Sequence, residues 1–115
     1  MEELYQAAGI EYDKGLERFM GNADLYQKFL TKFLYDGSFE EFCEGFEMGD
    51  LVMAEKAVHT LKGTAGNLSM MTLFRATDQT VKAIRSGKAQ EELRPFVKQV
   101  RLAYEMVCDA IRAHK

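Results

Sequence analysis

Apolar residues at helical spacing, interrupted by glycines at short intervals, are the feature that most constrains the fold of this chain. Between residues 22 and 37 the apolar side chains recur three or four positions apart, and residues 38–49 repeat the pattern. The same spacing predicts helices over residues 50–68, 69–87 and 90–112. No segment alternates between apolar and polar residues with a period of two, so no strand is expected. The chain is therefore predicted to be all-α.

Two shorter helical segments are expected nearer the N-terminus, over residues 2–8 and 13–19, each closely followed by a glycine. Short, glycine-marked connections between amphipathic helices favour an antiparallel four-helix bundle, here with short additional N-terminal helices. The chain has 115 residues, of which 47% are hydrophobic, enough for one core. We therefore expect a single domain over residues 1–115.

Polar residues at the predicted helix starts indicate where each helix begins. Asn22 and Asp50 are expected N-caps, because a short side-chain oxygen can accept a hydrogen bond from the free N–H groups of the first turn. Ser38 is expected to start the next helix after Asn22, with Glu41 at the capping-box position. Ser69 is the expected N-cap of the helix that follows residues 50–68.

His59 lies on the predicted helix of residues 50–68, on the side away from its apolar stripe. On a wheel of about 100° per residue, one sector of roughly 100° holds the apolar positions Ala54, Ala57, Val58, Leu61, Ala65 and Leu68. His59 points about 150° from the centre of that sector and should face water. Glu55, Lys56, Gly63 and Gly66 share its side of the wheel, and Lys62 lies on the flank.

Two glycines beside a water-facing histidine require an explanation, because each glycine inside a helix costs about 1 kcal/mol relative to alanine. Without side chains, Gly63 and Gly66 let the backbone of another protein approach the imidazole closely. Lys62, one turn after His59, adds a positive charge within reach of a bound anion. A neutral histidine is a competent nucleophile near neutral pH, since its ordinary pKa is about 6.5. Together these residues suggest a phosphoryl group carried on His59.

The run His59-Thr60-Leu61-Lys62-Gly63-Thr64-Ala65-Gly66-Asn67-Leu68 resembles the signature of histidine-containing phosphotransfer (HPt) domains of two-component phosphorelays. Upstream, the pairs Gly9-Ile10, Gly15-Leu16, Arg18-Phe19, Gly21-Asn22 and Leu25-Tyr26 resemble the usual N-terminal approach of that family, so the resemblance covers essentially the whole chain. Thr64 replaces the commoner serine and keeps the hydroxyl. Val81 stands where some members carry a glutamine, 22 residues after the histidine.

The resemblance implies a phosphorelay intermediate. His59 would accept a phosphoryl group through Nε2 from an aspartate of a receiver domain and return it to an aspartate of the same or another receiver. Lys62 would offset the phosphate charge. The surface that docks the receiver would include Val52, Glu55, Lys56, Thr60, Gly63 and Gly66. Val52 supports this from its position alone, because it falls on the outer face seven residues before His59, where folding does not need an apolar side chain.

The chain is not expected to be an enzyme that uses ATP. It has no glycine-rich nucleotide loop, no second catalytic base and no carboxylate cluster for magnesium. The resemblance therefore implies a phosphocarrier without a cofactor of its own, with the Mg²⁺ and most catalytic groups on the receiver. The expected partners are a response-regulator receiver domain and/or a hybrid histidine kinase, and the domain is expected to be a monomer.

Composition weighs against other partners. A net charge of −3 does not suit nucleic acid, which would need a basic face. No apolar run approaches the ~18 residues of a membrane span, and the start Met1-Glu2-Glu3 does not resemble a signal peptide. Cys43 and Cys108 are too few for a disulfide scaffold, which points to the reducing cytoplasm. With His59 and His114 they make no metal-binding spacing.

Two alternatives stay open. The chain would be a non-phosphorylated helical protein-interaction module if His59 were a remnant and the surface only docked proteins. It would be a histidine kinase fragment if it carried the dimerising helices of such a kinase. The second alternative is disfavoured because Thr60 follows His59, where these kinases usually have a glutamate.

Overall fold

The computed structural model describes residues 2–114, which form seven α-helices. The helices are α1 (Glu2–Ala7), α2 (Tyr12–Arg18), α3 (Ala23–Phe33), α4 (Ser38–Glu47), α5 (Leu51–Asn67), α6 (Met71–Arg85) and α7 (Gln90–His114). Within the described range there is no β-strand, and the one isolated β-bridge joins Ile10 to Met70. The prediction of an all-α chain is confirmed.

Two of the predicted helix caps are confirmed. The Asn22 side chain accepts a hydrogen bond of 3.0 Å from the Leu25 N–H at the start of α3. The Asp50 side chain accepts one of 3.0 Å from the Met53 N–H at the start of α5. These bonds satisfy first-turn donors that have no partner inside the helix.

Helix α4 begins at Ser38, as predicted, but the predicted capping box with Glu41 is wrong, and so is the predicted cap Ser69. Gly37 is the N-cap of α4, and the Ser38 N–H donates to the Asp36 carboxylate at 2.8 Å. Ser69 has a positive φ of 59° in the turn between α5 and α6, and Met70 precedes α6. The first N–H of α6 is instead satisfied by backbone, because the Met71 N–H donates to the Gly9 carbonyl at 2.8 Å.

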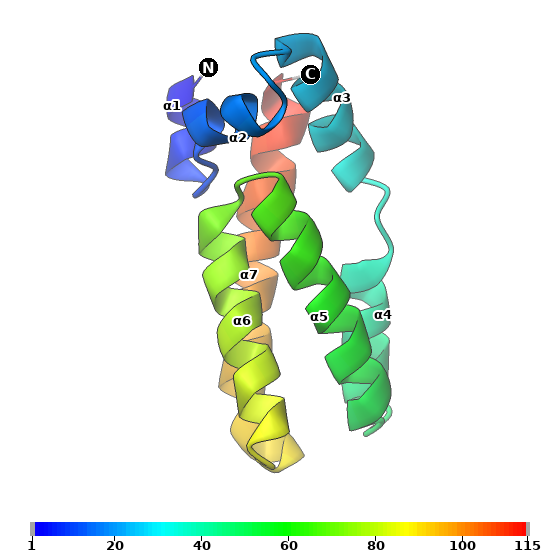
Figure 1. Ribbon diagram of the computed structural model, residues 1–115. Coiled ribbons are helices and arrows are strands. Elements are labelled where there is room, and N and C mark those ends of the chain that lie inside the picture. The colour runs from blue at the N-terminus through cyan, green and yellow to red at the C-terminus, as the bar shows by residue number, and fades with distance from the viewer. Residues whose placement is uncertain (1, 115) are drawn as a thin grey trace.

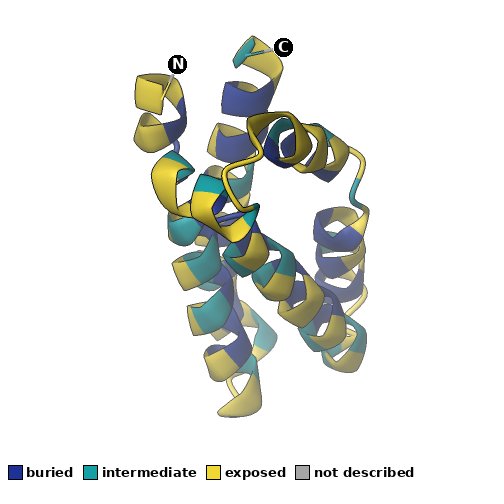
Figure 2. Cartoon of the chain, turned by 45° about the horizontal axis from the view of Figure 1, so that its top comes forward, coloured by how far each residue is buried: buried dark blue, intermediate teal, exposed yellow. Residues whose placement is uncertain are grey.

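The four C-terminal helices pack in the order of the chain. Helix α5 lies between α4 and α6, and α7 packs against α6 and also contacts α3 and α4 (Figure 1). The helices turn their buried sides inward and their exposed sides outward, as Figure 2 shows. The fully buried side chains of this core include Phe42, Val58, Leu61, Leu73 and Val100.

Helices α1 and α2, here called the N-terminal helical pair, lie at the end of the molecule where α5 meets α6 (Figure 1). Beyond the Gly9–Met71 bond, the Glu11 N–H donates to the Ser69 carbonyl at 2.9 Å. The hydroxyl of buried Tyr26 donates to the Leu68 carbonyl at 2.6 Å. The C-terminal end of α5 is therefore held by residues from the first quarter of the chain.

No helix within residues 2–114 is long and apolar enough to cross a membrane. Neither cysteine is in a disulfide, with Cys43 half-buried and Cys108 buried.

Candidate functional site

Helix α5 presents His59 to solvent and its apolar stripe to the core, as the wheel predicts. The whole predicted stripe is buried, comprising Ala54, Ala57, Val58, Leu61, Ala65 and Leu68. His59, Lys56 and Thr60 are exposed on the opposite side. Val52 is 81% exposed, which confirms that a large apolar side chain lies on this outer face.

His59 lies in a shallow depression of about 340 Å³, here called the His59 depression. Its lining residues are Val52, Glu55, Lys56, His59, Thr60 and Arg85. Four of the six predicted docking residues therefore surround His59. Arg85 comes from α6, at its last residue, and was not predicted.

Arg85 is held at the depression by an ion pair with Glu55. The Arg85 Nε lies 2.9 Å from Glu55 Oε2, and the two side chains are 57% and 33% exposed. Glu55 lies one turn before His59 on α5, so this pair places a guanidinium beside the histidine face.

Lys62 lies on the same α6-facing side of α5 as Glu55, two turns further along, and is also engaged. Its ammonium lies 3.2 Å from Asp78 Oδ1 and 5.9 Å from the centre of the Phe74 ring, both on α6. Lys82 also pairs with Asp78, at 3.0 Å. Hydrogen bonds from Lys82 and Lys62 hold the pKa of the Asp78 carboxyl below its ordinary value. Lys62 does not line the His59 depression.

The two glycines of the α5 face differ in their surroundings. A Cβ added at exposed Gly63 would meet no atom within 4 Å. One added at Gly66 would lie 3.2 Å from Cδ1 of Phe74 on α6. The space at Gly63 is therefore open to a partner, whereas the space at Gly66 admits the Phe74 ring.

The remaining signature residues make contacts within α5 or toward α3. Thr60 Oγ1 donates to the Lys56 carbonyl at 3.1 Å, and Thr64 Oγ1 donates to the Thr60 carbonyl at 3.3 Å. Thr64 and Asn67 line a second hollow of about 340 Å³. Its other walls are Phe19, Phe29, Lys32, Phe33, Asp36 and Leu68. Thr64 and Asn67 thus face α3 rather than the depression around His59.

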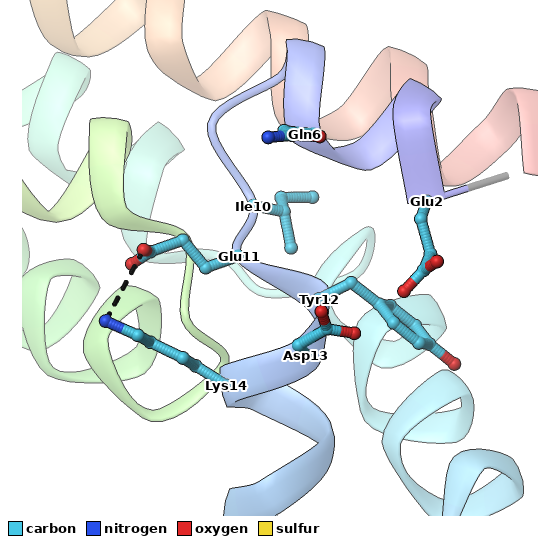
Figure 3. Close-up of a pocket in the computed structure, with 7 residues that line it drawn as sticks. All are labelled: Glu2, Gln6, Ile10, Glu11, Tyr12, Asp13 and Lys14. Carbon is cyan, nitrogen blue, oxygen red and sulfur yellow. Dashed lines mark ion pairs between the residues drawn. The ribbon is translucent and has the colours of Figure 1, made fainter.

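A third hollow, of about 300 Å³, lies at the N-terminal helical pair (Figure 3). It is lined by Glu2, Gln6, Ile10, Glu11, Tyr12, Asp13 and Lys14. A hydrogen bond with Asp13 raises the pKa of the Glu2 carboxyl, and Lys14 pairs with Glu11 at 3.7 Å. All its walls come from the first 14 residues, so it is separate from His59.

Within residues 2–114, no three His, Cys, Asp or Glu side chains lie close enough together to hold a metal ion. Comparison with protein-family models, curated proteins and solved structures gives no match for this chain. The function of the site is therefore inferred from its own geometry and chemistry.

Proposed function

We propose that this chain is an HPt-type phosphocarrier that holds a phosphoryl group on His59. The observation that carries the proposal is an exposed histidine beside an open glycine, on a helix whose other side is core. Such a residue contributes little to folding, and a large partner can reach it.

The fold proposed with this function is an antiparallel four-helix bundle, extended by short N-terminal helices. Two ion pairs between α5 and α6 support it. Glu55 and Lys62 lie seven residues apart on α5, and they pair with Arg85 and Asp78, which lie seven residues apart on α6 in the reverse order. Two helices that run in opposite directions produce this reversed pairing.

The proposed chemistry is transfer between an acyl phosphate and an imidazole. With the ring neutral and its proton on Nδ1, the Nε2 lone pair of His59 attacks the phosphorus of a receiver's aspartyl phosphate. A P–N bond forms, the P–O bond to the aspartate breaks, and its electron pair leaves with the carboxylate. The reverse attack by an aspartate regenerates His59. The receiver supplies the Mg²⁺ and the groups that stabilise the transferring phosphoryl.

The proposed partners are receiver domains of response regulators or hybrid histidine kinases, met by a monomer in the cytoplasm. A phosphorylated, radiolabelled receiver should transfer its label to this chain. The label should be acid-labile and stable to base, as a phosphoramidate is. An alkali-labile label would indicate an acyl phosphate and contradict His59 as the acceptor.

One observation favours a non-phosphorylated interaction module instead. The Lys62 ammonium is bound to Asp78 rather than directed at His59. A chain that binds a phosphorylated receiver but takes no label from it would support this second function.

Replacement of Gly63 should change stability and transfer in opposite directions. Alanine fits the open surface and removes backbone freedom from the unfolded chain, so Gly63→Ala should stabilise the fold by about 0.5–1 kcal/mol. The added methyl, and more so the side chain of Gly63→Gln, would obstruct a docking receiver. Urea melts and transfer from a phosphorylated receiver measure the two effects.

The matched control for this prediction is Gly66→Ala, where the new Cβ would press on Phe74 and offset the gain in stability. A small donor such as phosphoramidate needs no docking surface and should label Gly63→Gln almost as well as wild type. Full receiver-dependent transfer in Gly63→Gln would show that this surface is not where the receiver docks.

Replacement of Lys62 tests whether its ammonium leaves Asp78 for the phosphoryl group. Lys62→Ala should keep the fold and weaken transfer, or shorten the lifetime of the phosphorylated form, by about 1 kcal/mol, the scale of a charge at a hydrated site. Lys82→Ala removes the other partner of Asp78 and is the control. Equal effects of the two variants would assign the loss to Asp78 rather than to a contact between Lys62 and phosphate.

A further inference from the structure

We propose that Arg85 is a phosphate-binding residue of the His59 site and that Glu55 restrains it until the phosphoryl group is present. This inference rests on the proposed function, because it describes how the same site handles the charge it receives. It gives the depression a cation from α6, a helix outside the signature run.

The geometry makes the Arg85 guanidinium available to an anion. It lines the His59 depression, and Glu55 binds it through Nε. Within residues 2–114, no other hydrogen bond or ion pair engages the guanidinium. The two terminal nitrogens therefore keep their donors for a ligand, and a planar guanidinium can bind two phosphate oxygens at once.

Lys62 is less well placed for the same task. Both of its contacts, with Asp78 and with the Phe74 ring, hold its ammonium against α6, two turns beyond Glu55 on the same side of α5. Its ammonium would have to give up Asp78, whose side chain is 26% exposed. Arg85 would give up a more exposed pairing, and its side chain is itself more than half exposed.

Glu55 sets how strongly the site holds a phosphoryl group. Its carboxylate carries one negative charge, whereas a phosphoryl group carries up to two, so the phosphoryl group competes well for the guanidinium. Before transfer, Glu55 neutralises Arg85 and keeps it at the depression. After transfer, the Glu55 carboxylate lies one turn from phosphorylated His59 and repels the negative charge of the phosphoryl group.

Because Arg85 attracts the phosphoryl group and Glu55 repels it, this proposal can be distinguished from a purely structural role of the ion pair. Arg85→Ala and Glu55→Gln both remove the same ion pair, so a purely structural loss would move them in the same direction. A phosphate-binding role requires the two substitutions to change the affinity for a phosphoryl group in opposite directions. Arg85→Ala should lower the affinity of the site for a phosphoryl group, and Glu55→Gln should raise it.

The first measurement is the phosphorylated fraction at equilibrium in phosphoramidate and a fixed concentration of ammonium, followed by ³¹P NMR. A small donor avoids effects on receiver docking. The ratio of phosphorylated to free protein should fall roughly two- to five-fold in Arg85→Ala and rise by a similar factor in Glu55→Gln, with Arg85→Lys in between. Arg112→Ala is the control, since it removes a similarly exposed arginine that pairs with Asp109 on α7.

The second measurement is a titration of the unphosphorylated protein with inorganic phosphate, followed through the Arg85 Nε–H and His59 ring NMR signals. Shifts of both signals in wild type, with loss of the His59 shift in Arg85→Ala, would support the anion site. If wild type takes no label yet shows these shifts, the phosphocarrier function is overturned and the anion site stands. If wild type, Arg85→Ala and Glu55→Gln all reach the same phosphorylated fraction, the role of Arg85 is overturned and the carrier function stands. Absence of both label and shifts overturns both.

Discussion

A His59→Gln variant is expected to accept no phosphoryl group and to fold like the wild type. Glutamine has no ring nitrogen that can attack phosphorus, so the loss of label should be complete. The side chain is exposed on the outer face of α5, and substitutions at such positions usually change stability by no more than about 0.5 kcal/mol. Transfer of label from a phosphorylated receiver and urea melts of the same preparations measure the two results.

The control is the other histidine of the chain. His114 lies in the last turn of α7, where its ring packs edge-on against Tyr5 with 5.3 Å between the ring centres. His114→Gln should keep full labelling. Label that survives in His59→Gln and disappears in His114→Gln would place the acceptor on α7 and contradict the prediction. A loss of more than about 2 kcal/mol in His59→Gln would contradict its exposed position.

A Gly15→Ala variant is expected to destabilise the fold by about 3 kcal/mol, the upper end of the usual cost of overpacking. Gly15 is buried in α2, and a Cβ at this position would overlap the ring and hydroxyl of Tyr26. Tyr26 is fully buried, and its hydroxyl is bound to the Leu68 carbonyl, so it cannot move aside freely. Denaturant melts measure the loss.

A double-mutant cycle shows whether Tyr26 is the cause. Shortening the ring in Tyr26→Leu is destabilising by itself, but it removes the atoms that the new Cβ would strike. Gly15→Ala should therefore cost much less in the Tyr26→Leu background than in the wild type. Additive effects would show that the alanine is accommodated without contact with Tyr26. Gly63→Ala, in open space on α5, should change stability with the opposite sign.

Much of the helical structure could be predicted, because the 3.6-residue period determines which side of each helix is apolar. The outward position of His59 follows from that period alone, as do the buried positions of Val58 and Leu61. Asn22 and Asp50 could be predicted as caps because each bond involves residues three positions apart.

The partners across α5 and α6 could not be predicted in the same way. Arg85 meets Glu55, and Lys62 meets Asp78, only because the turn between the two helices fixes how far one is shifted along the other. The sequence does hold complementary charges at the same seven-residue spacing on the two helices. However, several different shifts of α6 along α5 would each have paired some of the charges.

Gly63, Gly66 and Ser69 show a second limit of prediction from sequence, which is that contacts between distant residues leave no local pattern. A helical wheel places Gly63 and Gly66 on one face, yet α6 covers only the second of them with Phe74. Ser69 was a reasonable cap by residue type. However, the Gly9 carbonyl supplies the acceptor at the start of α6, and residues so distant in sequence leave no local pattern.

The hydrogen bonds between the N-terminal helical pair and the α5–α6 turn also constrain the order in which the chain can fold. Gly9 and Glu11 pair with backbone about sixty residues further along, so translation produces them well before their partners emerge. Closing so long a loop costs chain entropy that is recovered only when the two ends meet. Local pairs such as α5 with α6 can form earlier, since a short turn joins them. The first N–H of α6 therefore obtains its backbone acceptor only when the start of the chain docks against this turn.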